Sequence, residues 1–253
     1  MPEPILSVSG LTKTFKLQGR ADVHAVKDVT FDLMPGECLG LIGESGSGKT
    51  TLVNLITGLL PATAGTVTLD GMDVTKCRGK ELRAAWKKMQ VVFQTPTESF
   101  DPRRTLGDGI CESMRNNGVS KADAQKRAEE LLELCGLPKT FIKRDPHEVS
   151  GGQCQRAAIA RALAIEPKLL ICDEATSALD VTIQAEIIAL LRKLRKELDM
   201  SILFVCHDIA LVQQFCDRLL VMYHGEIVES GVPSEVIAAP KNPYTQDLIN
   251  SIL

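Results

Sequence analysis

The sequence GESGSGKT at residues 43–50 lies between the apolar run CLGLI at 38–42 and the run TLVNLITGLL at 51–60. It matches the pattern G-x-x-x-x-G-K-[ST], which forms a phosphate-binding loop when a buried strand precedes it and a helix follows it. Both neighbouring runs have the composition that this context requires. We therefore predict a strand, a phosphate-binding loop and a helix over residues 38–60, with a plain glycine-rich turn as the alternative.

The glycines of this loop would allow its backbone to wrap closely around an anion with the amides pointing inward. The helix that begins near Lys49 adds the positive end of its dipole. Lys49 would reach the β- and γ-phosphates of a nucleotide, and the Thr50 hydroxyl would bind magnesium. The loop residues expected to contact a nucleotide are Gly43, Glu44, Ser45, Gly46, Ser47, Gly48, Lys49, Thr50 and Thr51.

The segment LLICDE at 169–174 is another apolar run, and it ends in two carboxylates. If LLIC is a strand, Asp173 at its end can bind magnesium, and Glu174 can orient and polarise an attacking water. An acidic pair after a strand is more often the solvated start of a loop. A phosphate-binding loop in the same chain favours the catalytic interpretation.

The order of the predicted elements indicates an α/β fold with a mostly parallel sheet, because short apolar runs alternate with helical stretches. Before Cys38, the runs ILSVSGLTKTF and HAVKDVTFDL predict antiparallel strands, and VTLDG at 67–71 predicts a strand that ends in a turn. The run RLLVMYHGEIVES predicts a hairpin that turns at His224 and Gly225. The remaining predictions are strands at 89–93, 169–172 and 202–206 and helices at 181–198, 233–239 and 243–252.

We expect a single domain over residues 1–253, since a chain of this length with 44% hydrophobic residues can bury one core. Residues 95–158 are rich in helix formers, as in KADAQKRAEELLELCGL. We therefore predict a helical subdomain over 95–158, inserted into a core that is formed by residues 1–94 and 159–253.

The charge balance and the cysteines exclude several classes of protein. A net charge of −3 and a pI of about 5.9 leave no excess of positive charge for a nucleic acid, which is not expected as a partner. The apolar runs are too short to span a membrane, and the first residues do not resemble a signal peptide, so we expect a cytosolic chain. The eight cysteines lack C-x-x-C spacing, which indicates reduced, mostly buried thiols and no metal site.

A second glycine-containing stretch, VSGGQCQRAAIARAL at 149–163, also opens a predicted helix. Ser150 can cap this helix, and the free amides that follow can bind an anion. Capping alone remains the alternative. Because one chain already has a lysine-bearing loop, the second anion site would serve a nucleotide held by another subunit, with the two copies arranged head to tail.

These motifs together resemble the ATP-binding-cassette (ABC) ATPases. The resemblance covers essentially the whole chain, and its motifs occur in the family's order: GESGSGKT, Gln94 in VVFQ, SGGQ at 150–153, LLICDE, SALD at 177–180 and His207 in FVCH. It implies a P-loop NTPase core of RecA-like fold with an N-terminal antiparallel β-subdomain. It also implies a sandwich dimer that binds and hydrolyses ATP with Mg²⁺.

The resemblance also assigns roles to individual residues. ATP on Lys49 of one subunit would be closed over by Ser150, Gly151, Gly152 and Gln153 of the other, and Asp180 would cross the interface. Gln94 would contact magnesium and the attacking water, and His207 would contact the γ-phosphate. Phe15 matches the position where the family stacks an aromatic ring on adenine, while a plain core phenylalanine is the alternative.

Three stretches resemble the ATPases of dipeptide, oligopeptide and nickel importers: QTPTESFDPRRT at 94–105, PHEVSGGQCQR at 146–156 and NPYTQDLINSIL at 242–253. Val149, Cys154 and Asn242 depart from that group's usual residues, and neither Val149 nor Cys154 should abolish nucleotide contact. The end at Leu253 leads us to expect no iron–sulfur site and favours the second ATPase of a pair. A soluble assembly such as the carbon–phosphorus lyase system, whose ATPase-like subunits look similar, is the alternative.

An importer implies several partners. The expected ones are a second ABC ATPase subunit (the same chain or a related one), two transmembrane permease subunits and, indirectly, a solute-binding protein. The chain would then lie on the inner face of the cell membrane as a peripheral subunit that powers the uptake of peptides, nickel or a similar small solute.

Overall fold

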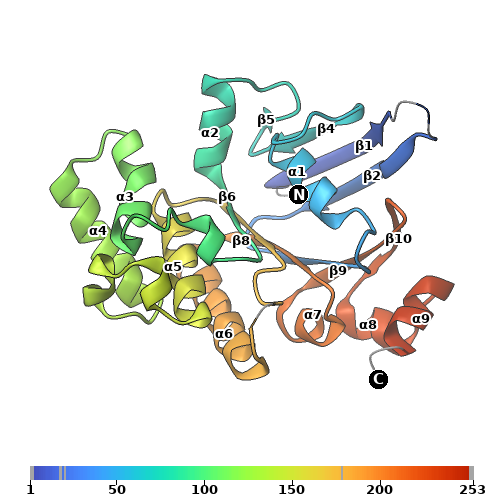
Figure 1. The fold of residues 1–253 in the computed structure, drawn as a ribbon. Helices are drawn as coiled ribbons and strands as arrows, with labels where there is room; N and C mark the ends of the chain where they lie inside the picture. Colours follow the sequence, from blue (N-terminus) through green and yellow to red (C-terminus); the bar gives the residue numbers. More distant parts are fainter. Residues whose placement is uncertain (1–2, 17–18, 20, 178, 251–253) are drawn as a thin grey trace.

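The computed structural model describes residues 3–16, 19, 21–177 and 179–250. Within them, two sheets and the surrounding helices form the fold (Figure 1). The strands are β1 (Leu6–Phe15), β2 (Val23–Leu33), β3 (Cys38–Ile42), β4 (Ala64–Leu69), β5 (Met72–Asp73), β6 (Met89–Val92), β7 (Leu169–Asp173), β8 (Ser201–Cys206), β9 (Arg218–Tyr223) and β10 (Glu226–Gly231).

Most helices lie at the left of the molecule and beneath the larger sheet in Figure 1, while the first two α-helices lie beside the N-terminal strands. The α-helices are α1 (Lys49–Ile56), α2 (Lys80–Lys88), α3 (Leu106–Asn116), α4 (Lys121–Leu134), α5 (Gly151–Leu163), α6 (Val181–Leu198), α7 (Ile209–Phe215), α8 (Pro233–Ala238) and α9 (Pro243–Asn250). Three short 3₁₀ helices complete the described elements: η1 (Thr97–Ser99), η2 (Lys139–Lys143) and η3 (Pro146–Glu148).

The central sheet has the order β10-β9-β3-β8-β7-β6, and its strands are parallel except for the β9–β10 hairpin. This confirms the predicted α/β class. The carboxyl ends of β3 and β8 lie side by side, since Ile42 pairs with Cys206, and Asp173 at the end of β7 pairs with Val205. The three segments that follow these strands therefore leave the sheet at the same edge, where α/β folds bind their ligands.

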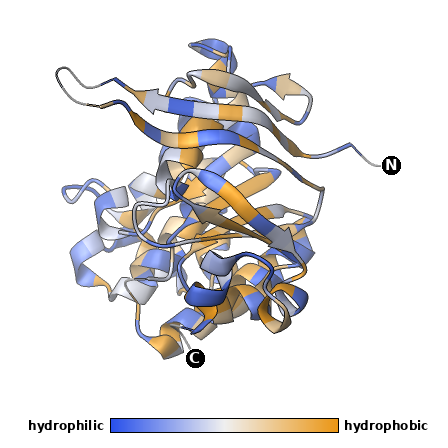
Figure 2. Cartoon of the chain, turned by 90° about the vertical axis from the view of Figure 1, so that its right-hand side faces the viewer, coloured by the Kyte–Doolittle hydropathy of each residue, from blue (hydrophilic) through white to orange (hydrophobic). Residues whose placement is uncertain are grey.

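The two faces of the central sheet contribute to two hydrophobic cores. Along β3, Cys38 and Ile42 pack into the core that contains the helices α3 to α6, while Leu39 and Leu41 pack into the core shared with α1 and the N-terminal strands. This alternation follows from the period of two along a strand. Figure 2 shows the hydrophobic residues gathered along the inner strands between the two layers of the fold.

The N-terminal strands form the second sheet, in the order β2-β1-β4-β5, and its pairs are antiparallel as expected. The hairpin β9–β10 turns at His224 and Gly225, also as expected. The helix expected over 51–60 is shorter: α1 ends at Ile56, and Gly58 follows in a left-handed conformation with φ of 70°. A glycine in this conformation ends a helix readily, since it has no Cβ that would oppose it.

Between Thr97 and Leu163 every element of the chain is a helix, and α3, α4 and α5 pack on one another. Helix α5 runs through residue 158 without interruption, so the subdomain boundary predicted there falls inside a helix. The helix predicted at 243–252 is described as far as Asn250, and of the SALD motif Ala178 is outside the described residues.

All eight cysteines are buried and free, as predicted. Of the helices in the described ranges, none has the length and apolar character needed to cross a membrane.

Candidate functional site

The phosphate-binding loop connects β3 to α1 and is packed tightly against other parts of the chain. Gly48 has a φ of 110° and stands at the N-cap of α1. A Cβ on Gly48 would lie 2.4 Å from the carbonyl oxygen of Ala25, and one on Gly43 would lie 2.2 Å from that of Met222. A side chain at either position would displace backbone of β2 or β9, so glycine is required at both.

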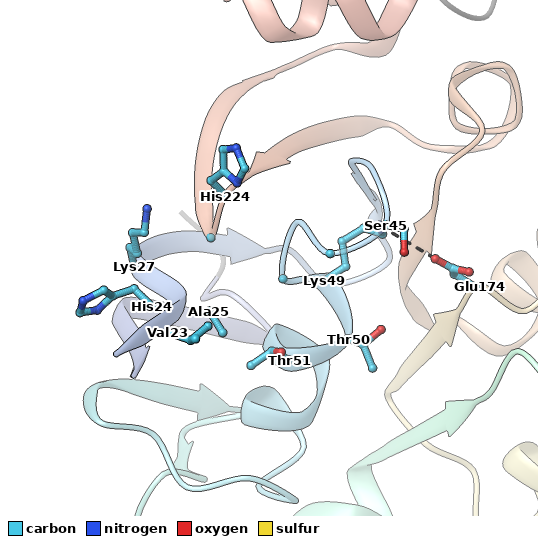
Figure 3. Close-up of a pocket in the computed structure, with 13 residues that line it drawn as sticks. Val23, His24, Ala25, Lys27, Ser45, Lys49, Thr50, Thr51, Glu174 and His224 are labelled. Carbon is cyan, nitrogen blue, oxygen red and sulfur yellow. Dashed lines mark ion pairs between the residues drawn. The ribbon is translucent and has the colours of Figure 1, made fainter. Parts of the chain in front are cut away.

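A cavity of about 520 Å³ opens over the loop. In Figure 3, His24 and Lys27 lie at one end of it and Glu174 at the other. Its volume suits a ligand of nucleotide size. The residues that line it are Val23, His24, Ala25, Lys27, Ser45, Gly46, Gly48, Lys49, Thr50, Thr51, Glu174, His224 and Gly225.

Lys49 is buried at the inner end of this cavity, with 4% of the residue exposed. Its Nζ donates to the carbonyl oxygens of Gly43 at 2.7 Å and Glu44 at 2.9 Å, and lies 3.9 Å from a carboxylate oxygen of Glu174. Burial lowers the pKa of Lys49, and the Glu174 carboxylate gives the largest opposing effect. The ammonium group is thus held inside the loop by neutral carbonyls that an anion can replace.

Asp173 ends β7 and is buried with 7% exposed. Burial, and after it the nearby Glu174 carboxylate, raises the pKa of Asp173 to about 6. Its Oδ1 has no hydrogen-bond partner among the described residues. A buried carboxylate oxygen without a partner is costly unless a cation binds it.

A second cavity of about 750 Å³ brings Asp173 together with Thr50, Gln94 and Glu174. A hydroxyl, an amide oxygen and a carboxylate are the hard oxygen ligands that Mg²⁺ prefers. Glu174 follows Asp173 with a φ of 49°, and its N–H donates to the carbonyl oxygen of Val205 at 2.9 Å. The predicted metal ligands Thr50, Gln94 and Asp173 therefore fit a divalent cation.

The second glycine-containing stretch lines neither cavity. Ser150 caps α5: its hydroxyl accepts from the N–H of Gln153 at 3.3 Å, and the Gln153 side chain accepts from the N–H of Ser150 at 3.0 Å. Gly151 is exposed, and Gly152 packs closely against Ile183 of α6. The predicted capping is confirmed, and the helix N-terminus is separate from the phosphate-binding loop of its own chain.

Asp180, His207 and Phe15 also lie outside the two cavities. Asp180 caps α6 by accepting from the N–H of Ile183 at 3.0 Å, and His207 is an exposed residue directly after β8. Phe15 is 37% exposed, and the ammonium of Lys13 lies 5.1 Å from its ring centroid. The alternative of a core phenylalanine is therefore wrong. Phe15 pairs with Val23, which does line the first cavity.

Several residues that line the first cavity belong to no sequence motif and were not predicted. His24, Ala25 and Lys27 belong to β2, and His224 turns the β9–β10 hairpin with a φ of 45°. They reach the loop only because β2 and the hairpin pack on it, as in the hydrogen bond from the Gly225 N–H to the Ser47 carbonyl at 2.9 Å. Such contacts depend on tertiary structure.

Comparison with known proteins identifies relatives of the whole chain. The family described as ABC transporter matches residues 26–177. A putative peptide import ATP-binding protein of Brucella ovis is 43% identical over 250 residues, which are 98% of this chain and 78% of that protein. The oligopeptide transport ATP-binding protein OppF of Salmonella typhimurium is 45% identical over 232 residues, or 91% of this chain and 70% of that protein.

A solved structure has the same fold. The dimeric ATP-binding cassette MJ0796, in a post-hydrolysis state bound to ADP and Pi, superposes with a TM-score of 0.82 at 32% sequence identity. The match covers 90% of this chain and 98% of that one.

Proposed function

Because this chain belongs to the ABC transporter family of ATPases, we propose that it is the ATP-hydrolysing subunit of an importer that takes up peptides. The observation that carries the proposal is the meeting of Lys49, Asp173 and Glu174 at one edge of the central sheet, beside a cavity of about 520 Å³. A lysine-bearing loop, a buried carboxylate and a second carboxylate beside it are the groups that ATP hydrolysis requires.

ATP would bind with its phosphates in the loop and its adenosine toward β2. Backbone amides of the loop after Glu44 and the dipole of α1 favour the phosphates, and the Lys49 ammonium exchanges its carbonyl partners for phosphate oxygens. Val23, His24 and Ala25 line the cavity away from Glu174. Phe15 is an exposed aromatic residue and pairs with Val23 in the sheet, so it lies near this end of the cavity. This position supports contact between its ring and adenine.

Hydrolysis needs a positioned water and compensation of the phosphate charge. Glu174 acts as the general base, Gln94 orients the water, and His207 contacts the γ-phosphate after the segments close on it. Thr50, Gln94 and Asp173 would hold Mg²⁺, which when bound neutralises charge on the β- and γ-phosphates. Asp173 Oδ1, which has no hydrogen-bond partner in the part of the chain that the structure describes, supports this assignment.

Each complete site would need a second subunit. Ser150, Gly151, Gly152 and Gln153 open α5, and Asp180 opens α6 close to them, but none of them lines the cavities of its own chain. The amides at the start of α5 can bind the γ-phosphate of an ATP held by another chain. The partner is a second copy or a related ABC ATPase.

The permease would bind in a groove of about 410 Å³ between the central sheet and α3. Leu59 and Phe93 are 54% and 40% exposed there, and Trp86, Met89 and Val91 extend its apolar wall. Exposed apolar side chains in a groove typically bind another protein. The groove adjoins Gln94, so a bound permease segment can move with the active site. The chain would thus be peripheral on the inner face of the membrane.

The names of the two relatives favour peptides over nickel as the cargo. Affinity purification of the tagged chain from gently solubilised native membranes, followed by mass spectrometry, tests the importer. We expect two polytopic membrane proteins and an ABC ATPase partner, together with stimulation of ATP hydrolysis by a peptide-loaded binding protein. Recovery of soluble enzymes without a membrane protein would instead support the lyase-like assembly.

A further inference from the structure

The C-terminal segment NPYTQ reaches the phosphate-binding loop. Tyr244 lies in the first turn of α9, and its hydroxyl oxygen accepts a hydrogen bond from the N–H of Glu44 at 2.9 Å. Glu44 is the second residue of the loop, 200 positions earlier in the chain. The proposed catalytic machinery assigns no role to this contact.

The position of Tyr244 is fixed by several other contacts. The Glu229 carboxylate accepts from the N–H groups of Lys241 at 2.8 Å and Asn242 at 3.0 Å, and the Asn242 side chain accepts from the N–H of Tyr244 at 2.9 Å. The Tyr244 ring also stacks on Tyr223 of β9, with centroids 3.9 Å apart and an angle of 23°. Tyr244 therefore approaches the loop from a rigid support.

The contact determines the orientation of one peptide group in the loop. The N–H of Glu44 and the carbonyl oxygen of Gly43 belong to the same peptide group. While this N–H points outward to Tyr244, the Gly43 carbonyl oxygen points inward and accepts from Lys49 Nζ at 2.7 Å. Burial raises the pKa of Tyr244, so the phenol stays neutral near pH 7 and its oxygen remains a good acceptor. A rotation of the Gly43–Glu44 peptide group would break both of these hydrogen bonds together.

We propose that Tyr244 is a positioning residue that holds the phosphate-binding loop in the shape that accepts ATP. The inference rests on the proposed ATPase function and adds a role for the C-terminal segment in it. Tyr244 touches neither substrate nor reacting atoms. Because the contact keeps the nucleotide-free loop in the shape that binds ATP, its loss adds the cost of ordering the loop to ATP binding. The contact is the same in the ATP-bound state and in the transition state, so the chemical step is almost unchanged.

The test compares Tyr244→Phe with Tyr223→Phe in the purified full-length chain. Tyr244→Phe keeps the stacked ring and removes only the acceptor of the Glu44 N–H. Tyr223→Phe also removes one hydroxyl from the same pair of rings, but in the described part of the chain that hydroxyl makes no hydrogen bond, so it is the matched control. Isothermal titration with ATP gives the dissociation constant, phosphate release gives KM and kcat, and thermal unfolding reports on stability.

We expect Tyr244→Phe to raise the dissociation constant and KM for ATP about three- to tenfold, as for the loss of one hydrogen bond. Its kcat should remain within about twofold, and Tyr223→Phe should match the wild type. Equal ATP affinity in Tyr244→Phe and wild type would overturn the inference, as would a fall in kcat and melting temperature at constant KM, which a purely structural role would cause. Failure of the wild type to bind ATP would refute the proposed function itself.

Discussion

The ammonium nitrogen of Lys49 lies 3.9 Å from a carboxylate oxygen of Glu174. This distance is too long for a direct hydrogen bond, and Nζ donates instead to two loop carbonyls. The two charged groups lie close together in the wall of the first cavity, at the end where we expect the terminal phosphate of ATP (Figure 3). Lys49 can bind the phosphate while Glu174 stays free to accept a proton from water.

Replacing Lys49 by Ala should weaken ATP binding about ten- to a hundredfold, because it removes charge-assisted hydrogen bonds to the phosphates. Isothermal titration of the purified chain measures the effect. Lys193→Ala is the matched control, since Lys193 is a surface residue of α6 whose ammonium lies 3.9 Å from Glu197. Equal ATP affinity of Lys49→Ala and the control would show that Lys49 does not contact the phosphates.

Asp173→Asn should raise the melting temperature of the nucleotide-free and metal-free protein at pH 7.5 by several degrees. Because the folded-state pKa of Asp173 is about 6, above its ordinary value of 3.8, ionisation destabilises the fold as the pH rises from about 4 to 6. The resulting loss in the free energy of unfolding is complete above about pH 6 and is on the order of 2–3 kcal/mol. The gain should therefore be smaller at pH 5 than at pH 7.5.

The wild type and Asp173→Asn also test whether Mg²⁺ binds at Asp173. Mg²⁺ with ATP should raise the melting temperature of the wild type more than ATP alone does, and this difference should vanish in Asp173→Asn. A variant that melts below the wild type at pH 7.5 and still responds to Mg²⁺ would contradict the assignment.

The strands and the loop were predictable because their signals are local. The run CLGLI, the glycines after it and the apolar run LLIC before Asp173 give buried strands and a tight turn wherever they occur, so β3 and β7 match their predicted positions within a residue. The end of α1 was misplaced because the apolar residues continue to Leu60, whereas the conformation of Gly58 decides where the helix stops. Helix α2 was not predicted, because it has only one buried residue and therefore no strong apolar pattern.

The candidate site was only partly predictable. Residues that belong to sequence motifs, such as Lys49 and Asp173, could be identified from the spacing of the motif residues. His24 and His224 reach the cavity through the packing of β2 and a hairpin, and Tyr244 reaches Glu44 across most of the chain's length. No local pattern in the sequence encodes those contacts.

Gly151→Asp should abolish most ATP hydrolysis and leave ATP binding by the isolated chain within about twofold. The new carboxylate would repel the phosphates of an ATP held by the other subunit. Among the described residues, a Cβ at Gly151 meets only Leu179, at an ordinary 3.6 Å. Gly151→Ser is the neutral control and should retain hydrolysis within a few-fold. Phosphate release at wild-type level in Gly151→Asp would show that this helix end does not serve a nucleotide.

Leu59→Glu should prevent permease subunits from co-purifying with the chain, since it places a charge in the apolar groove beside α3. Leu59 is 54% exposed, so the substitution should not disturb folding, and ATP binding should be unchanged. Val119→Glu, at a residue that is 39% exposed and outside the groove, is the control. Unchanged recovery of the permease with Leu59→Glu would place its binding surface elsewhere.

We propose that Glu174 activates water for ATP hydrolysis beside Lys49. The most direct measurement is steady-state phosphate release by the wild type and Glu174→Gln, with ATP binding measured on the same preparations. We expect release to fall by about a hundredfold or more in Glu174→Gln, the usual contribution of a general base, while ATP still binds. Equal release by the two proteins would contradict the role of Glu174 and the mechanism built on it.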